Sequence, residues 1–425
     1  MGLLRTGALL FAVAVAPWPR GTTAVHTDAV IDGVGRSDSA VNVHELLQAV
    51  RGAPPLLCGM AAEAVSSGMG GYAWDAPSPP VGAEVRARLT LLADRELGPA
   101  EVDSLLAGLD ERDACVREVS ARLLGRAGDA APVDALLQRL ASASSATRAA
   151  TALALGLARP QRALEPLLRV LSDTSVAVRS NAAWALGRVH DTRAVAPLTH
   201  ALRDAQPAVR AAAVEALGHI RSADPVGALM QVLRNDASAD VRKAAAWALG
   251  QLNDRAAVDA LTTALQRDDN AEVREMAAWA LGRLDDAAAM DALATAVRAD
   301  RSADVKSTAA WAIGQIRPER APAGLVQGLR DADRDVRMNA AWALGQIRDT
   351  AAVPALETAL QKESDQQVRR AEFRALLMVG ERSEAALEAA LKSGDAEIRE
   401  MAAMALAGHG ARPWPWPRPK PRPFP

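Results

Sequence analysis

One six-residue string recurs through this chain and constrains its fold more than any other feature. Ala-Ala-Trp-Ala-Leu-Gly occupies residues 182–187, 245–250, 277–282 and 340–345, and residues 309–314 carry it with isoleucine in place of leucine. When intermediate units are aligned with these strings, successive glycines from Gly125 to Gly345 are 31 or 32 residues apart. A period of this length indicates a stacked array of similar units rather than one globular core.

The register extends beyond the strings themselves. A β-branched residue stands nine positions before each of these glycines and before the residues that replace them in the outer units. These β-branched residues run from Val85 at one end to Ile398 at the other. The sequence therefore predicts about ten or eleven units, with degenerate outer units of the kind that cap such arrays.

Each unit has the pattern of two helices, as residues 178–203 illustrate. Val178, Ala182, Leu186 and Val189 share one face of a first helix, and Val195 begins a similar face on a second. Asp191 suits an N-cap between them. Equivalent capping aspartates are Asp129, Asp254, Asp286 and Asp349. Because aromatic residues are only 3% of the chain, alanine and leucine must supply the burial. We predict an all-α, right-handed superhelical α-solenoid.

Charged residues repeat with the same period. An acid usually stands six residues before the Arg or Lys that follows the first-helix valine, and stacking would bring each acid near basic groups of its own or the next unit. The pairs are Glu111 and Arg117, Asp173 and Arg179, Asp204 and Arg210, Asp236 and Arg242, Asp268 and Arg274, Asp300 and Lys306, Asp331 and Arg337, and Glu363 and Arg369. We predict a charge ladder that sets the register between units, with independently solvated charges as the alternative.

The string Val-Arg-x-x-Ala-Ala-x-Ala-Leu-Gly, together with this ladder, resembles HEAT repeats of the short class named after phycobilisome lyases. The resemblance covers about residues 85–410. It implies a protein-binding scaffold that uses a concave face. Relatives with this repeat type suggest alternatives: a chromophore-handling lyase, a metal-dependent hydroxylase, or an accessory of an envelope sensor or peptidase system. The hydroxylases bind iron through repeated His-Glu pairs, whereas His44-Glu45 is the only such pair here and precedes the repeats.

Five tryptophans occupy one position of the repeated helix, six residues after its valine. At 100° per residue this position lies 240° from the valine, nearly opposite the core stripe. By resemblance, such positions line the concave face. The predicted binding strip comprises Trp184, Trp247, Trp279, Trp311 and Trp342, with Arg188, Gln251, Arg283, Gln315 and Gln346 after the glycines. Asn181, Thr308 and Asn339 would add to a polar rim. The alternative is that the indoles are packing residues between units.

The segments outside the array have different compositions. Arg5, the apolar run 7–16 and the small residues up to Ala24 predict a signal peptide over residues 1–24, and hence export to a periplasmic or extracellular location. Residues 25–84 read as a linker with an N-terminal helical segment from Val43, and residues 411–425 as a Pro-rich extended tail. No later segment approaches the length of a membrane span.

The sequence contains no recognisable catalytic or metal motif. Gln48 stands where a zinc-protease helix would need its second histidine after His44-Glu45. Forty-nine basic and 51 acidic residues give a net charge of −2, which argues against a nucleic-acid partner. We expect a monomeric protein without catalytic activity, cofactor or metal, whose partner is another protein. Cys58 and Cys115 are expected to be free thiols, with a long-range disulfide as the alternative.

Overall fold

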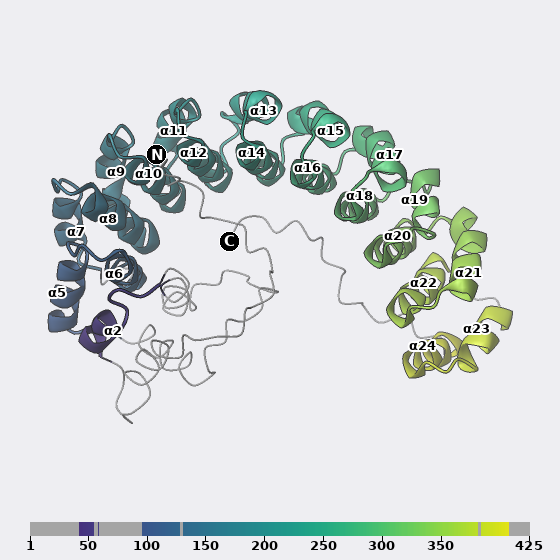
Figure 1. The fold of residues 1–425 in the computed structure, drawn as a ribbon. Coiled ribbons are helices and arrows are strands. Elements are labelled where there is room, and N and C mark those ends of the chain that lie inside the picture. Colours follow the sequence, from purple (N-terminus) through teal and green to yellow (C-terminus); the bar gives the residue numbers. More distant parts are fainter. Residues whose placement is uncertain (1–41, 55–57, 59–95, 128–130, 381–383, 408–425) are drawn as a thin grey trace, which may run out of the picture.

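The computed structural model describes residues 42–54, 58, 96–127, 131–380 and 384–407 (Figure 1). The predicted leader, the Pro-rich tail and the first helix of the unit predicted at Val85 lie outside these residues. Within the described part every regular element is a helix. No helix there combines the length and the apolar composition needed to cross a bilayer.

After α2 (Val43–Ala49), the helices alternate between two layers of a curved array. The outer helices are α5 (Pro99–Gly108), α7 (Val133–Arg139), α9 (Leu164–Val170), α11 (Val195–Ala201), α13 (Val226–Asn235), α15 (Val258–Arg267), α17 (Met290–Ala299), α19 (Ala323–Gly328), α21 (Val353–Lys362) and α23 (Glu384–Leu391). The inner helices are α6 (Ala114–Arg126), α8 (Ser145–Ala158), α10 (Val176–Val189), α12 (Pro207–Ile220), α14 (Ala239–Leu252), α16 (Ala271–Leu284), α18 (Ala303–Ile316), α20 (Arg334–Ile347), α22 (Gln366–Val379) and α24 (Ala396–Leu406).

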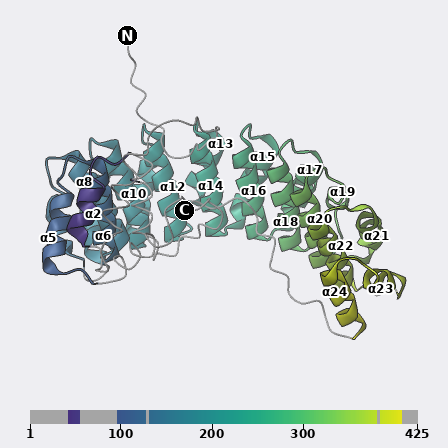
Figure 2. The same cartoon turned by 60° about the horizontal axis from the view of Figure 1, so that its bottom comes forward.

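The array bends into an arc whose concave side is formed by the inner helices (Figures 1 and 2). This confirms the predicted α-solenoid. The pairing within a unit differs from the prediction, because each outer helix packs on the inner helix that follows it in the chain. The helix that carries the repeated string is therefore the second helix of its unit. A tight acid-containing turn joins α11 to α12, whereas a 3-10 turn, Thr192–Ala194, links α10 to the next unit.

The predicted capping aspartates hold these 3-10 turns. Asp191, Asp254, Asp286 and Asp349 each accept a hydrogen bond from the backbone N–H two residues later, at 2.9–3.0 Å. Asp129 lies outside the described residues. Before each of these turns the inner helix ends on a residue in the left-handed region, such as Arg348, with φ 60°, before Asp349.

The glycine of the repeated string permits close contact between consecutive inner helices. A methyl group on Gly250 would lie 2.8 Å from Cζ3 of Trp279 and 3.0 Å from Cβ of Ala280. The same indole-on-glycine contact recurs along the array, at Gly156 with Trp184, Gly218 with Trp247, Gly282 with Trp311 and Gly314 with Trp342. The repeated string therefore supplies both sides of each contact between consecutive inner helices, which we call a joint. The tryptophan of one unit fills the space that the glycine of the preceding unit leaves.

The charge ladder forms between units, and its geometry is more specific than the prediction. Arg179 donates through Nε and Nη2 to both carboxylate oxygens of Asp204 in the next unit, at 2.7 and 3.0 Å. Its Nη1 donates to the carbonyl of Asp173, the acid six residues earlier, at 2.7 Å. The ion pairs are Arg148–Asp173, Arg179–Asp204, Arg210–Asp236, Arg242–Asp268, Arg274–Asp300, Lys306–Asp331 and Arg337–Glu363.

These pairs are largely shielded from water, so the alternative of independently solvated charges is wrong. The side chains of Arg274 and Asp300 are only 7% and 9% exposed. At the N-terminal end Arg117 donates to the carbonyls of Glu111 and Arg112, as Arg179 does to those of Asp173 and Thr174. At the C-terminal end the ladder differs from the prediction, because Arg370, rather than Arg369, pairs with Asp395 at 2.8 Å.

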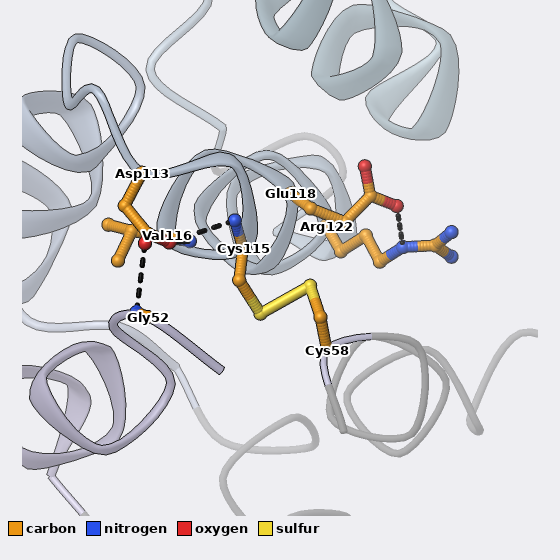
Figure 3. The surroundings of a disulfide bond; sticks show 7 residues. All are labelled: Gly52, Cys58, Asp113, Cys115, Val116, Glu118 and Arg122. Carbon is orange, nitrogen blue, oxygen red and sulfur yellow. Dashed lines mark hydrogen bonds and ion pairs between the residues drawn. A yellow bond between two sulfur atoms is a disulfide. The ribbon is translucent and has the colours of Figure 1, made fainter. Parts of the chain in front are cut away.

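The N-terminal end of the array is closed by α2, which packs on α5 and α6. Asp113 caps α6 by accepting from Cys115 and Val116, and it also accepts from the N–H of Gly52, at 2.8 Å, just after α2 (Figure 3). Cys58 and Cys115 form a disulfide with a Cα–Cα distance of 5.4 Å. The expectation of free thiols is therefore wrong, because the chain between α2 and α5 returns Cys58 to the start of α6.

The C-terminal end is built differently from the middle. A second hydrophobic cluster, separate from the main core, holds α23 and α24 on Phe373 of α22. Beside it, Glu372 occupies the core position that alanine fills in the repeated strings, as Ala340 does in α20. Glu372 is fully buried, and neither carboxylate oxygen has a hydrogen-bond partner among the described residues, so burial raises its pKa to about 8.

Candidate interaction surface on the concave face

The five tryptophans of the repeated position are largely buried, which overturns the prediction that they stand outward. Trp247, Trp279, Trp311 and Trp342 are 3–8% exposed, and Trp184 is half-buried. The helical-wheel argument considered one helix in isolation, whereas in the array the preceding inner helix covers the side of each indole. The alternative, in which the indoles pack between units, accounts for their burial. We call these five residues the indole row.

The accessible side chains of this face lie one helical turn further on. Arg188, Gln251, Gln315 and Gln346 are half-exposed and Arg283 is exposed, and we call these five residues the polar row. The guanidinium of Arg283 lies 5.7 Å from the ring centre of Trp279, and that of Arg188 lies 5.9 Å from Trp184. Arginine at this distance from an indole makes a cation–π contact. The polar row is therefore the accessible part of this face, and the indoles form its floor.

The predicted polar rim residues are used inside the array instead. Asn181 donates to the carbonyl of Ala149 on the preceding inner helix at 2.9 Å, and Asn339 donates to the Ser307 hydroxyl at 2.6 Å. Thr308 donates to a carboxylate oxygen of Glu275 at 3.3 Å. Thr308 and Asn339 are buried. These polar groups connect neighbouring inner helices.

One acid interrupts the indole row between α10 and α14, and a histidine takes the position of the polar row beside it. Glu215 takes the tryptophan position in α12, and His219 lies one turn later. The His219 ring is 5.0 Å from Trp247 and 6.4 Å from His190. Burial, reinforced by the positive charge of neighbouring groups, lowers the pKa of His219 below its ordinary value. The sequence shows Glu215 as an exception to the repeat, but only the fold shows that no described residue pairs with its carboxylate.

The described residues contain no cluster of three or more His, Cys, Asp or Glu side chains that could hold a metal ion. His44 is the histidine of the incomplete zinc-protease pattern. Its Nε2 atom lies within hydrogen-bond distance, 2.9 Å, of Nε2 of Gln48 on the same helix.

Comparisons with known proteins agree with this architecture. The family model described as HEAT repeats matches residues 102–176, 164–229, 226–312 and 290–377, which together cover more than half of the chain. No curated protein matches the sequence significantly.

Three solved structures illustrate the range of similar proteins. YibA of Escherichia coli is 23% identical over 68% of this chain and 99% of its own, with a TM-score of 0.45. The CpcE–CpcF complex of phycocyanin lyase from Nostoc sp. is 19% identical over 58% of this chain and 93% of its own, with a TM-score of 0.35. Yeast importin-beta is 16% identical over 85% of this chain and 56% of its own, with a TM-score of 0.51, and shares the solenoid fold. The repeat matches decide the family, and the chain belongs to the HEAT-repeat proteins.

Proposed function

We propose that the chain is an exported, non-catalytic scaffold that binds a protein partner along its concave face. The observation that carries this proposal is the polar row, a series of partly exposed side chains repeated at successive units above a floor of buried indoles. Such a surface combines a rigid aromatic base with polar groups at the edge, as protein interfaces do. A solenoid presents it over many units, which suits an extended partner.

Two further observations support export. The first is the sequence of the predicted leader, residues 1–24. The second is the Cys58–Cys115 disulfide, because disulfides persist in oxidising compartments and are rare in the cytosol.

The experiment uses the chain from Val25 onward, with its disulfide, to capture a partner from an envelope extract. The affinity of the captured partner is then measured for two charge-reversed proteins. R188E/R283E changes the polar row, and R234E/R298E makes the same charge change at exposed positions of the outer helices α13 and α17.

We expect the concave variant to lose at least tenfold in affinity and the outer variant to bind normally. Equal binding by both would contradict a concave interface. A pigment or stoichiometric iron in the purified native protein would contradict a non-catalytic scaffold and favour the lyase or hydroxylase alternative.

A further inference from the structure

The indole row is interrupted once between Trp184 and Trp342, and the interruption is a carboxylate. At five of the six joints between α8 and α20, the glycine of one inner helix meets the indole of the next. At the remaining joint, Gly187 of α10 meets Ala216 of α12, and Glu215 takes the position of the tryptophan. A short charged side chain therefore stands where a large aromatic ring fills every neighbouring joint.

Glu215 is half-buried and makes no hydrogen bond or ion pair with any residue that the structure describes. Burial raises its pKa to about 7. Its carboxylate oxygens are not among the side-chain atoms that are sealed from water without a partner, so they keep contact with solvent. Glu215 is therefore a partly desolvated acceptor within reach of a ligand, and a charged donor would supply the partner that the fold does not.

The charged and titratable groups on the helices around Glu215 are engaged elsewhere. On α10, Arg188 lies over Trp184, and on α14, Lys243 pairs with Glu272 at 2.6 Å. On α12, His219 contacts Trp247 edge to face, and its lowered pKa leaves it neutral near pH 7. Arg159 and Arg221 add positive charge around His219 without pairing with Glu215, and burial lowers the pKa of His190 as well. The carboxylate thus has a hydrogen-bonding capacity that no neighbouring cation uses.

We infer that Glu215 receives an arginine side chain of the protein partner, which lies on the concave face between the helices that carry Trp184 and Trp247. A guanidinium can donate two parallel hydrogen bonds to a carboxylate and can stack on an indole. It is also more weakly hydrated than an ammonium group, so its transfer into a half-buried site costs less than that of lysine. This inference rests on the proposed function and specifies the chemistry of the partner at one position.

The test uses the full chain with ¹³C-labelled glutamate and two small probes, N-acetyl-arginine methylamide and its citrulline counterpart. Citrulline has nearly the same shape as arginine but no charge. We expect saturable binding of the arginine probe, at least tenfold tighter than that of citrulline, with shifts in the Glu215 carboxyl signal and in the Trp184 and Trp247 indole signals. Since the ionised carboxylate is the binding form, affinity should rise roughly tenfold between pH 6 and pH 8.

Three variants separate this site from general charge attraction. E215Q keeps the shape and removes the charge, and E215W restores the residue of the indole row, so both should lose the preference for arginine. E275Q is the matched control, because Glu275 is also half-buried with a pKa raised to about 7 but is already hydrogen-bonded by Thr308. It should bind as the unaltered protein does.

No saturable binding of the arginine probe, or an equal loss in E275Q, would overturn the inference. So would a captured partner that binds E215Q normally. If that partner still fails to bind R188E/R283E, the concave interface stands and only the role of Glu215 is lost.

Discussion

The indole of Trp279 lies against Gly250 of the preceding inner helix, where an added methyl group would be 2.8 Å from its Cζ3 atom. The contact leaves no room for a side chain, so Gly250→Ala should force the two helices apart. We expect a loss of about 1–3 kcal/mol in the free energy of unfolding, the usual effect of overpacking. Denaturant unfolding followed by circular dichroism measures it.

Gly227→Ala is the matched control for this substitution. Gly227 lies in the outer helix α13, and a methyl group there would meet no atom within 4 Å. Alanine has the higher helix propensity, by up to about 1 kcal/mol, so this variant should be equally stable or more stable. Destabilisation of both variants by the same amount would show that the contact at Gly250 has no special importance.

The ladder pair of Arg179 and Asp204 should contribute to stability because both side chains are shielded from water. They are 15% and 14% exposed. Arg179→Met leaves the Asp204 carboxylate without its cation and should cost roughly 3 kcal/mol. Arg193→Met, which breaks ion pairs of a 64%-exposed arginine, should leave the melting temperature unchanged.

The same pair predicts a pH dependence. The hydrogen bond from Arg179 holds the pKa of Asp204 below its ordinary value. A lowered native pKa gives stability that is present above the unfolded pKa, about 3.9, and is lost as the pH falls through the native value. The stability difference between the unaltered protein and Arg179→Met should therefore shrink below about pH 4. A constant difference down to pH 2 would contradict this.

Glu372 should have the opposite pH dependence. Its pKa is about 8 because burial disfavours the charged form, with Glu363 opposing ionisation and Arg337 and Arg369 favouring it. The unfolded state releases this proton near pH 4.3, so the native state loses stability as the pH rises from there to about 8. Glu372→Ala restores the alanine of the repeat and should stabilise the protein by about 1–3 kcal/mol at pH 8, and by less at pH 5.

Glu372→Gln serves as the control for the titration. It should remove the contribution of Glu372 to the pH dependence while the buried polar group remains, so its unfolding free energy should decline less steeply between pH 5 and pH 8 than that of the unaltered protein. Glu215 and Glu275, whose pKa values are raised to about 7, account for the slope that remains. A decline of equal slope in this variant would assign the effect to another group.

Arg317 ends its inner helix with a φ of 48°, a conformation that favours glycine. Arg317→Gly should therefore stabilise the protein by roughly 1 kcal/mol. The control is Gly380→Ala, at the equivalent end of α22 with φ 93°, which should destabilise it. Thermal unfolding of the two variants measures the difference, and a loss of stability in Arg317→Gly would contradict the argument.

Processing of the N-terminus can be checked by the intact mass of the protein isolated from its natural source. We expect a chain that starts near Val25 and is two hydrogens lighter than its reduced form, because of the Cys58–Cys115 disulfide. A native protein that retains Met1 would contradict export, whatever the state of its cysteines.

The sequence predicts the solenoid well because its determinants are local and repeated. The valine, alanine, leucine and glycine positions each recur with one period, and every unit confirms the others. The direction of Trp279 could not be predicted from a single helical wheel, because the neighbouring helix decides what covers it. The disulfide depends on the return of Cys58 to α6, which no local pattern records. Glu215 and Glu372 were detectable as exceptions at fixed repeat positions, but their missing partners required the fold.

The separate hydrophobic cluster at the C-terminal end has a mechanical consequence. The covalent Cys58–Cys115 link fastens one end of the array, while α23 and α24 are held by a small cluster of their own around Phe373. Under tension between the two ends, this last pair should detach first, at a low force, and lengthen the molecule while the remaining units stay folded. A stretched molecule would therefore begin to unfold at its C-terminal end, and the units fastened by the disulfide would unfold later.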